Sequence, residues 1–137
     1  MTTERKQMLA TDQNDLTMND YMMMQDRCAV CHWPVMRKGR TIELHHIVGG
    51  PGRKNPPDAS NWVPLCKRCH TCVHDRIPEA PELSKGAILT AKMENDGPID
   101  LEALAKLRGK HHLGYDPEPL PEFFIQERRK NGGEPWP

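Results

Sequence analysis

The stretch ELHHIVGG, residues 43–50, places two adjacent histidines at the end of an apolar run and two glycines directly behind them. The longer run TIELHHIV at 41–48 is rich in β-branched and apolar residues and is closed by the glycines, so it predicts a β-strand. Neighbouring side chains of an ideal strand leave on opposite faces. His45 and His46 should therefore not share one task.

Two further elements are predicted after this strand. NWVPLC at 61–66 predicts a second short strand, which Pro64 restricts to an edge or irregular position. KRCHTCVHDR at 67–76 contains no helix breaker and predicts a helix that stops before Pro78. Strand, strand and helix in this order indicate a small α+β fold.

Helices are also predicted on both sides of this unit. NDYMMMQDRC, at 19–28, predicts a short helix capped by Asn19 or Asp20, with Met22 to Met24 as core residues. The C-terminal helices are predicted at 82–96, 100–110 and 121–130. They carry no readable motif and would complete the core or dock on a partner. Residues 1–20 and the final GGEPWP should be loosely ordered.

Composition limits the class of protein. A chain of 137 residues is one domain's worth of sequence, and 36% apolar residues with only seven aromatics predict a modest core. The N-terminal stretch is polar throughout, unlike a secretory leader, and no apolar run approaches the length of a membrane span. We therefore expect a soluble cytoplasmic protein, in which clustered cysteines are metal ligands rather than disulfides.

Charge is unevenly distributed along a chain whose net charge is zero. Residues 37–76 hold eight Lys and Arg against three acids, whereas residues 77–137 hold eleven acids against eight bases. A basic middle is compatible with nucleic-acid binding, although charge clusters of this size also occur on ordinary solvated surfaces.

The cysteines form two pairs with the spacing of a structural zinc site. The pairs are Cys28 with Cys31 and Cys66 with Cys69, two C-x2-C motifs separated by 34 residues. Four thiolates in this arrangement suit tetrahedral Zn²⁺, whereas a thioredoxin-like redox motif would explain only one pair. Cys72 and His32 also lie close enough in sequence to supply the fourth ligand. The symmetry of the two pairs favours the first assignment, with Cys72 as a small buried residue.

Two more histidines lie on the predicted helix. His70 and His74 are four residues apart, which places them on one helix face within reach of one cation, and Lys67 precedes His70 on that face. The chain also offers a histidine pair at the strand end. We therefore expect at least one of the two helix histidines, His70 or His74, to bind a catalytic metal ion.

These motifs together resemble the HNH endonucleases. The resemblance rests on CAVC at 28–31, ELHHIVGG at 43–50, Asn61 in ASNWVPLC and CKRCHTCVH at 66–74, and it covers residues 28–76. It implies a ββα-metal, treble-clef-like core held by a four-cysteine zinc site. An N-terminal extension (1–27) with a short helix and a helical C-terminal extension (77–137) with a frayed tail would flank this core. Among HNH proteins, a short free-standing chain such as this one most resembles those that bacteriophages encode.

The resemblance also implies a task for each polar residue of the site. His45 would bind a divalent cation and His46 would be the general base that activates water. Asn61 would tether the loop and position that base. His70 would complete the metal site, and His74 corresponds to a further ligand found in only some members. Many members have Asp in place of His45, so the catalytic cation remains open between Mg²⁺, Mn²⁺, Ni²⁺ and Zn²⁺.

Phosphodiester hydrolysis requires this set of groups: a nucleophile, a cation and a base with a pKa near neutrality, which histidine provides. The predicted phosphate contacts, which would position duplex DNA without reading its sequence, are Arg53, Lys54, Lys67 and Arg68. We therefore expect a metal-dependent DNA endonuclease that nicks or cuts duplex DNA. Its C-terminal helices could dock on a larger phage packaging or recombination protein or on a second copy of the chain.

Two other classes stay open at this point. A non-catalytic zinc module that binds DNA or protein would keep the four cysteines but would not need His46, Asn61 and His70 together. A thiol redox protein would use one C-x2-C pair without a metal, so its zinc content would separate it from the nuclease.

Overall fold

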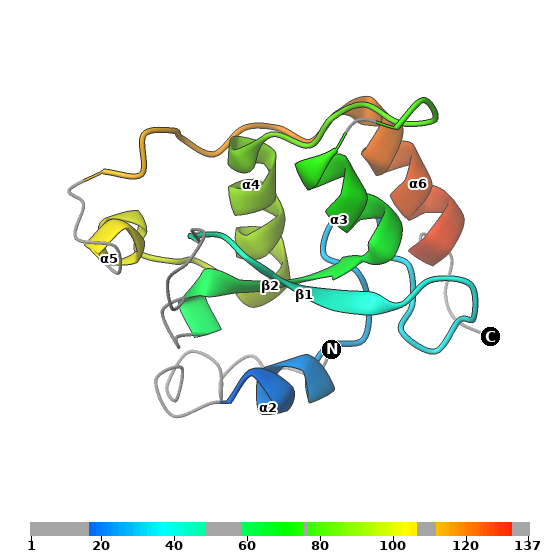
Figure 1. Ribbon diagram of the computed structural model, residues 1–137, viewed down its shortest axis with the longest axis horizontal. Coiled ribbons are helices and arrows are strands. Elements are labelled where there is room, and N and C mark those ends of the chain that lie inside the picture. Colours follow the sequence, from blue (N-terminus) through cyan, green and yellow to red (C-terminus); the bar gives the residue numbers. More distant parts are fainter. Residues whose placement is uncertain (1–16, 49–58, 76, 107–111, 133–137) are drawn as a thin grey trace.

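The computed structural model describes residues 17–48, 59–75, 77–106 and 112–132 (Figure 1). Its elements, in chain order, are α2 (Met18–Met23), β1 (Ile42–His46), the 3-10 turn η2 (Ala59–Asn61), β2 (Trp62–Cys66), α3 (Lys67–His74), α4 (Lys85–Asp96), α5 (Leu101–Lys106) and α6 (Glu122–Gly132). The expected small α+β fold is confirmed. No helix among these residues is long and apolar enough to cross a bilayer.

The two strands form an antiparallel pair in which His45 lies opposite Val63 and His46 opposite Trp62. Alternation along β1 places Glu43 and His45 on one face and His46 on the other. Pro64 is tolerated because each strand of a two-stranded sheet has a free edge. The Pro64 carbonyl accepts a hydrogen bond from the Ala29 N–H at 2.8 Å, which joins the segment of the first cysteine pair to β2.

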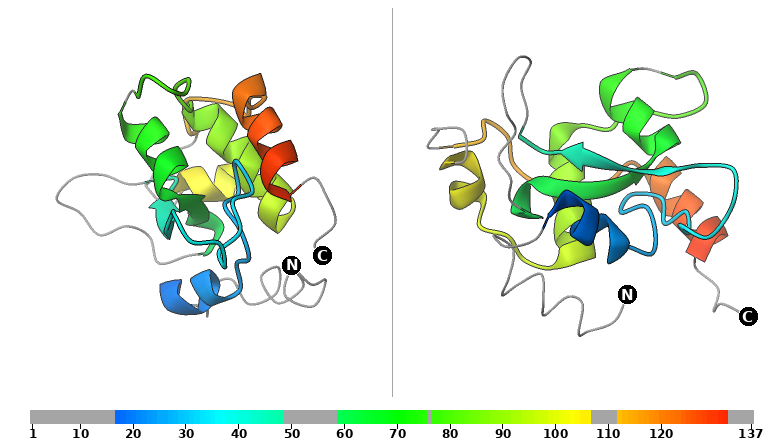
Figure 2. Two further views of the ribbon diagram at one scale, coloured as in Figure 1. Left: turned by 90° about the vertical axis from the view of Figure 1, so that its right-hand side faces the viewer. Right: turned by 60° about the horizontal axis from the view of Figure 1, so that its bottom comes forward.

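Strand β2 is the centre of the core, since all five of its residues are buried. Val63 and Leu65 pack in the largest apolar cluster with residues of α4 and α6, among them Ile88 and Phe124. Trp62 packs instead in a second cluster with Tyr21 of α2. Figure 2 shows the corresponding arrangement, with α2 on one side of the strands and α3 and α6 on the other. The C-terminal helices thus contribute to the core.

Side chains of helix α6 form hydrogen bonds to the segment that carries the first cysteine pair. The Arg128 guanidinium donates to the carbonyls of Val30 and Ala29 at 2.6 and 3.2 Å, and the Asn131 amide donates to the Cys31 carbonyl at 3.0 Å. These bonds satisfy three backbone acceptors of a tight loop, so α6 helps to hold the loop in the shape that presents its cysteines.

A buried polar network connects α2 and α4 to the turn η2. Lys92 is 2% exposed, donates to the Ala59 carbonyl at 2.7 Å and pairs with Asp96. The Tyr21 hydroxyl lies 2.8 Å from both the Trp62 carbonyl and an Asp96 carboxylate oxygen. Because the buried charges are paired and hydrogen-bonded, the network fixes the turn on which Asn61 lies.

Three local expectations were wrong. The cap of α2 is Thr17, whose side chain accepts from the Asp20 N–H at 3.0 Å, so the helix begins earlier than Asn19. Met23 is 72% exposed, whereas Met22 and Met24 contact the Tyr21 and Trp62 cluster. Loose order was expected at 1–20 and 132–137, but residues 17–20 form the cap and first turn of α2, and Gly132 ends α6. The remainder of those two ranges, 1–16 and 133–137, lies outside the described residues.

Candidate metal centres and active site

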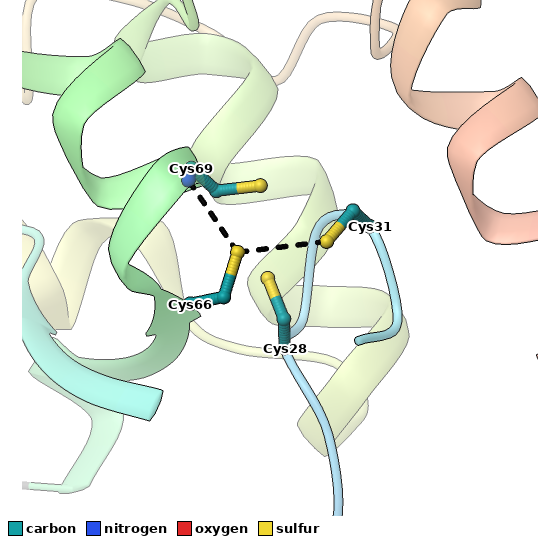
Figure 3. A group of neighbouring side chains, drawn as sticks. All are labelled: Cys28, Cys31, Cys66 and Cys69. Atoms are coloured by element: carbon teal, nitrogen blue, oxygen red, sulfur yellow. Dashed lines mark hydrogen bonds between the residues drawn. The ribbon is translucent and has the colours of Figure 1, made fainter. Parts of the chain in front are cut away.

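The four cysteines of the two C-x2-C motifs converge on one point (Figure 3). Cys28 and Cys31 come from the loop before β1, Cys66 ends β2, and Cys69 lies in the first turn of α3. All are buried, and their sulfur atoms lie within 4.8 Å of one another, with Cys31 Sγ 3.6 Å from Cys66 Sγ. Tetrahedral Zn–S bonds of about 2.3 Å require sulfur separations of about 3.8 Å. The cluster therefore fits one zinc ion.

The two alternative fourth ligands lie outside this cluster. Cys72 is 1% exposed and packs in the apolar core, as expected for a small buried residue. His32 follows Cys31 in a left-handed backbone conformation, with φ of 64°. Burial, assisted by Arg27 and Arg128, lowers the pKa of His32 to about 4, so its imidazole is neutral at pH 7.

Cys66 has the environment of a thiolate. It is the N-cap of α3, and its sulfur accepts from the Cys69 N–H at 3.5 Å. Hydrogen bonds from the Cys28, Cys31 and Cys69 side chains lower the pKa of Cys66 far below its usual value. A helix N-terminus also favours a negative charge. The N-cap position therefore favours the deprotonated form of Cys66, which metal binding requires.

A second group of side chains that could hold a metal ion lies between β1 and α3. Ligand nitrogens of His45, His70 and His74 lie within 4.8 Å of one another. Their ring centroids are 4.8 to 5.4 Å apart. His45 is buried at 8% exposure, His70 is half-buried and His74 is exposed. Imidazole binds transition metals at about 2.0 to 2.1 Å, so one cation can bind all three rings after a small contraction of the group.

Glu43 is a residue of this site that sequence reasoning missed. Its Oε1 lies 2.9 Å from Nδ1 of His70. With Nδ1 as the donor, Nε2 of His70 would be free to bind a cation, and the carboxylate would fix the ring and increase its basicity. Strand alternation could have indicated Glu43, because it lies two residues before His45 and so shares its face of the strand. Only the fold reveals that this face meets His70.

His46 is the last residue of β1 and is not part of the three-histidine group. It is half-buried, and burial together with the nearby His70 lowers its pKa below 6.5. The pKa of His45 is lowered to about 3, first by burial and then by His70, His74 and His46. Both rings are therefore neutral at pH 7. A neutral ring can serve as a metal ligand or as a proton acceptor.

Asn61 holds the chain immediately after the histidine pair. It is fully buried, its amide donates to the Val48 carbonyl at 3.0 Å, and its side-chain oxygen accepts from the Val48 N–H at 2.6 Å. The Asn61 carbonyl also accepts from the Ile47 N–H at 2.9 Å. These bonds attach the end of β1 to the turn before β2, which fixes the directions in which His45 and His46 leave the strand.

The predicted phosphate contacts differ in their surroundings. Lys67 is exposed at the start of α3 and lines a groove with Lys38 and Arg40. Arg68 is turned towards α6, where it pairs with Glu127 at 2.9 Å and lies over the Phe123 ring. Arg53 and Lys54 lie outside the described residues.

A comparison with known protein families matches the segment that contains both ligand clusters. Residues 28–76, a little over a third of the chain, match a family model described as HNH endonuclease. The matched segment contains the cysteine cluster, the three-histidine group, His46 and Asn61. Comparison with curated proteins and with solved structures gave no match. Over residues 28–76 the chain thus matches the HNH endonuclease family, and the family resemblance predicted from its motifs is confirmed.

Proposed function

We propose that this protein is a metal-dependent endonuclease that hydrolyses phosphodiester bonds of double-stranded DNA, with His46 as the general base. The observation that carries the proposal is the meeting of His45, His70 and His74 around one point, within the segment that matches the HNH family. A zinc module without catalytic activity has no need of this second group of ligands.

The two ligand clusters have different tasks in this proposal. The four cysteines hold a structural zinc ion. The three histidines hold a catalytic divalent cation, Mg²⁺, Mn²⁺, Ni²⁺ or Zn²⁺, and their all-nitrogen ligand set favours the transition metals. When bound, that cation supplies Lewis-acid stabilisation of the negative charge that develops on the phosphate and the leaving oxygen.

The protein's own groups supply the proton transfer and its geometry. His46 accepts the proton of the attacking water, a task that requires the neutral imidazole favoured by its lowered pKa. Asn61 orients the strand end through its two bonds to Val48. Glu43 fixes the His70 ring for metal binding. Lys67, one helical turn before His70, contacts the DNA backbone, whereas Arg68 would have to exchange Glu127 for phosphate.

Glu43→Gln should weaken cation binding at the histidines by about 10- to 100-fold, because the neutral amide cannot polarise His70 as a carboxylate does. Calorimetric titration of the zinc-loaded protein with Ni²⁺ measures the change. Glu122→Gln is the matched control, since Glu122 is an exposed residue of α6 whose ion pair with Arg129 is also exposed. Equal Ni²⁺ affinity of Glu43→Gln and the wild type would remove Glu43 from the site.

Loss of the predicted phosphate contacts should weaken DNA binding equally on all sequences. We expect each of Arg53→Ala, Lys54→Ala and Lys67→Ala to reduce the slope of log affinity against log salt by roughly one unit. Lys130→Ala on α6, where the lysine side chain is 74% exposed, is the control and should leave the slope unchanged. A loss restricted to particular sequences would instead place the altered residue against base edges.

Incubation of supercoiled plasmid with the zinc-loaded protein and each candidate cation tests the proposed activity. Relaxed circles would indicate nicking, and linear molecules would indicate cutting of both strands. A protein that binds the plasmid and leaves it supercoiled with every cation would favour the alternative function, a non-catalytic zinc module. A purified protein without zinc would favour thiol chemistry.

A further inference from the structure

Arg40 lies against the cysteine cluster on the side of the loop before β1. Its Nη1 is 3.7 Å from Cys31 Sγ and 3.8 Å from Cys66 Sγ, within the range of N–H···S hydrogen bonds. One of these sulfurs belongs to each C-x2-C pair. A single guanidinium therefore bridges the two halves of the cluster.

Trp33 holds that guanidinium in place. The Arg40 Cζ lies 4.1 Å from the centroid of the Trp33 ring, a close cation–π stack. Gly39 makes the approach possible, because its φ is +118° and a Cβ there would lie 3.3 Å from Trp33 Cζ2. The backbone thus passes close to the indole just before Arg40, whose Nη1 lies near both sulfurs.

The charge of the cluster explains why such a partner is useful. Four thiolates around Zn²⁺ carry a net charge of −2 in a buried place, and a buried charge without a partner is unfavourable. Arginine stays protonated at any relevant pH and presents several donors in a rigid plane. A lysine could supply the charge, but its single ammonium could not stack on Trp33 while it bridged two sulfurs.

We propose that Arg40, held by Trp33, donates hydrogen bonds to the zinc-bound thiolates of Cys31 and Cys66 and thereby retains the metal. This inference rests on the proposed structural zinc site. The positive guanidinium offsets part of the negative charge of the buried cluster, so four thiolates around one metal ion become more favourable at this place. Because Cys66 is followed directly by α3, a zinc ion retained in this way also keeps His70 and His74 in position.

Arg40→Gln and Arg40→Lys, made in the full-length chain, test the inference. We expect Arg40→Gln to bind zinc about 10- to 100-fold more weakly, measured by competition with a chromophoric chelator, and Arg40→Lys to fall between Arg40→Gln and the wild type. With Co²⁺ in place of zinc, the sulfur-to-metal charge-transfer band should move to lower energy in both variants, because the sulfur lone pairs lose their donors.

Lys38→Gln is the matched control. Lys38 is an exposed residue two positions before Arg40 and lines the same groove, so its replacement removes one positive charge from the same loop. We expect Lys38→Gln to keep the zinc affinity and the Co²⁺ band of the wild type. Equal changes in Lys38→Gln and Arg40→Gln would show a general charge effect and overturn the proposal.

Two further outcomes are decisive. Wild-type zinc affinity and an unmoved Co²⁺ band in Arg40→Gln would also overturn the inference, while the zinc site itself would stand. A wild-type protein that binds no zinc would instead refute the underlying site. Should Arg40→Gln fail to fold, the Co²⁺ band of Arg40→Lys alone decides, because that variant keeps the charge and loses the bridging geometry.

Discussion

His46→Ala should lose DNA cleavage by about 10²- to 10⁴-fold while its affinity for the catalytic cation stays nearly unchanged. The reason is that His46 would accept the proton of water but does not belong to the group of histidines that can share one cation. Rates of plasmid relaxation give the loss of activity, and calorimetric titration of the same zinc-loaded sample gives the cation affinity.

His45→Ala is the matched comparison, since it removes the adjacent imidazole from the other face of the same strand. This variant should lose activity because it binds the cation weakly, so part of the loss should recover at high cation concentration. Identical cation-titration curves for the two variants would contradict the division of tasks. Normal cleavage by His46→Ala would reject His46 as the base.

Cys66→Ser should lose zinc and unfold the segment around the cluster. Serine is a good helix N-cap, so this variant keeps the cap of α3 and removes only the thiolate ligand. Most of the folding energy of a small zinc-bound unit comes from the metal, so the melting transition should shift sharply or disappear. Zinc content and thermal unfolding measured by circular dichroism provide the test.

Cys72→Ser is the control for that variant. Cys72 is as deeply buried as the ligands but lies outside the cluster, so its replacement should keep full zinc content and cost only modest stability. If instead Cys66→Ser retained full zinc and Cys72→Ser lost it, Cys72 would be the fourth ligand.

The parts of the fold that sequence predicted are those that local patterns determine. The strand predicted at 41–48 is found at Ile42–His46, and it follows from β-branched and apolar character. The helix of His70 and His74 follows from the absence of breakers. The C-x2-C pairs were recognisable because each pair spans one tight turn. Helix starts were less accurate, since Thr17, Asn19 and Asp20 are all good caps and packing selects among them.

The contacts that complete the sites could not be predicted, because they join distant parts of the chain. Glu43 meets His70 only after β1 lies against α3, and Arg128 reaches the Val30 carbonyl from a helix almost a hundred residues away. Lys67 and Arg68 illustrate the same limit. They are neighbours in sequence, but one helical step of about 100° turns one to solvent and the other to Glu127.

The most direct measurement is plasmid cleavage as a function of cation bound at the histidines, with the cysteine cluster already loaded. Protein stripped to about one zinc ion per chain is mixed with supercoiled plasmid, and Ni²⁺ or Mn²⁺ is then added in steps. We predict no cleavage at the start and a rate that rises in proportion to occupancy of the histidine group, with no rise in a variant that lacks His45, His70 and His74. A cation that binds at these histidines without any cleavage, or cleavage that persists in the triple variant, would contradict the proposed active site.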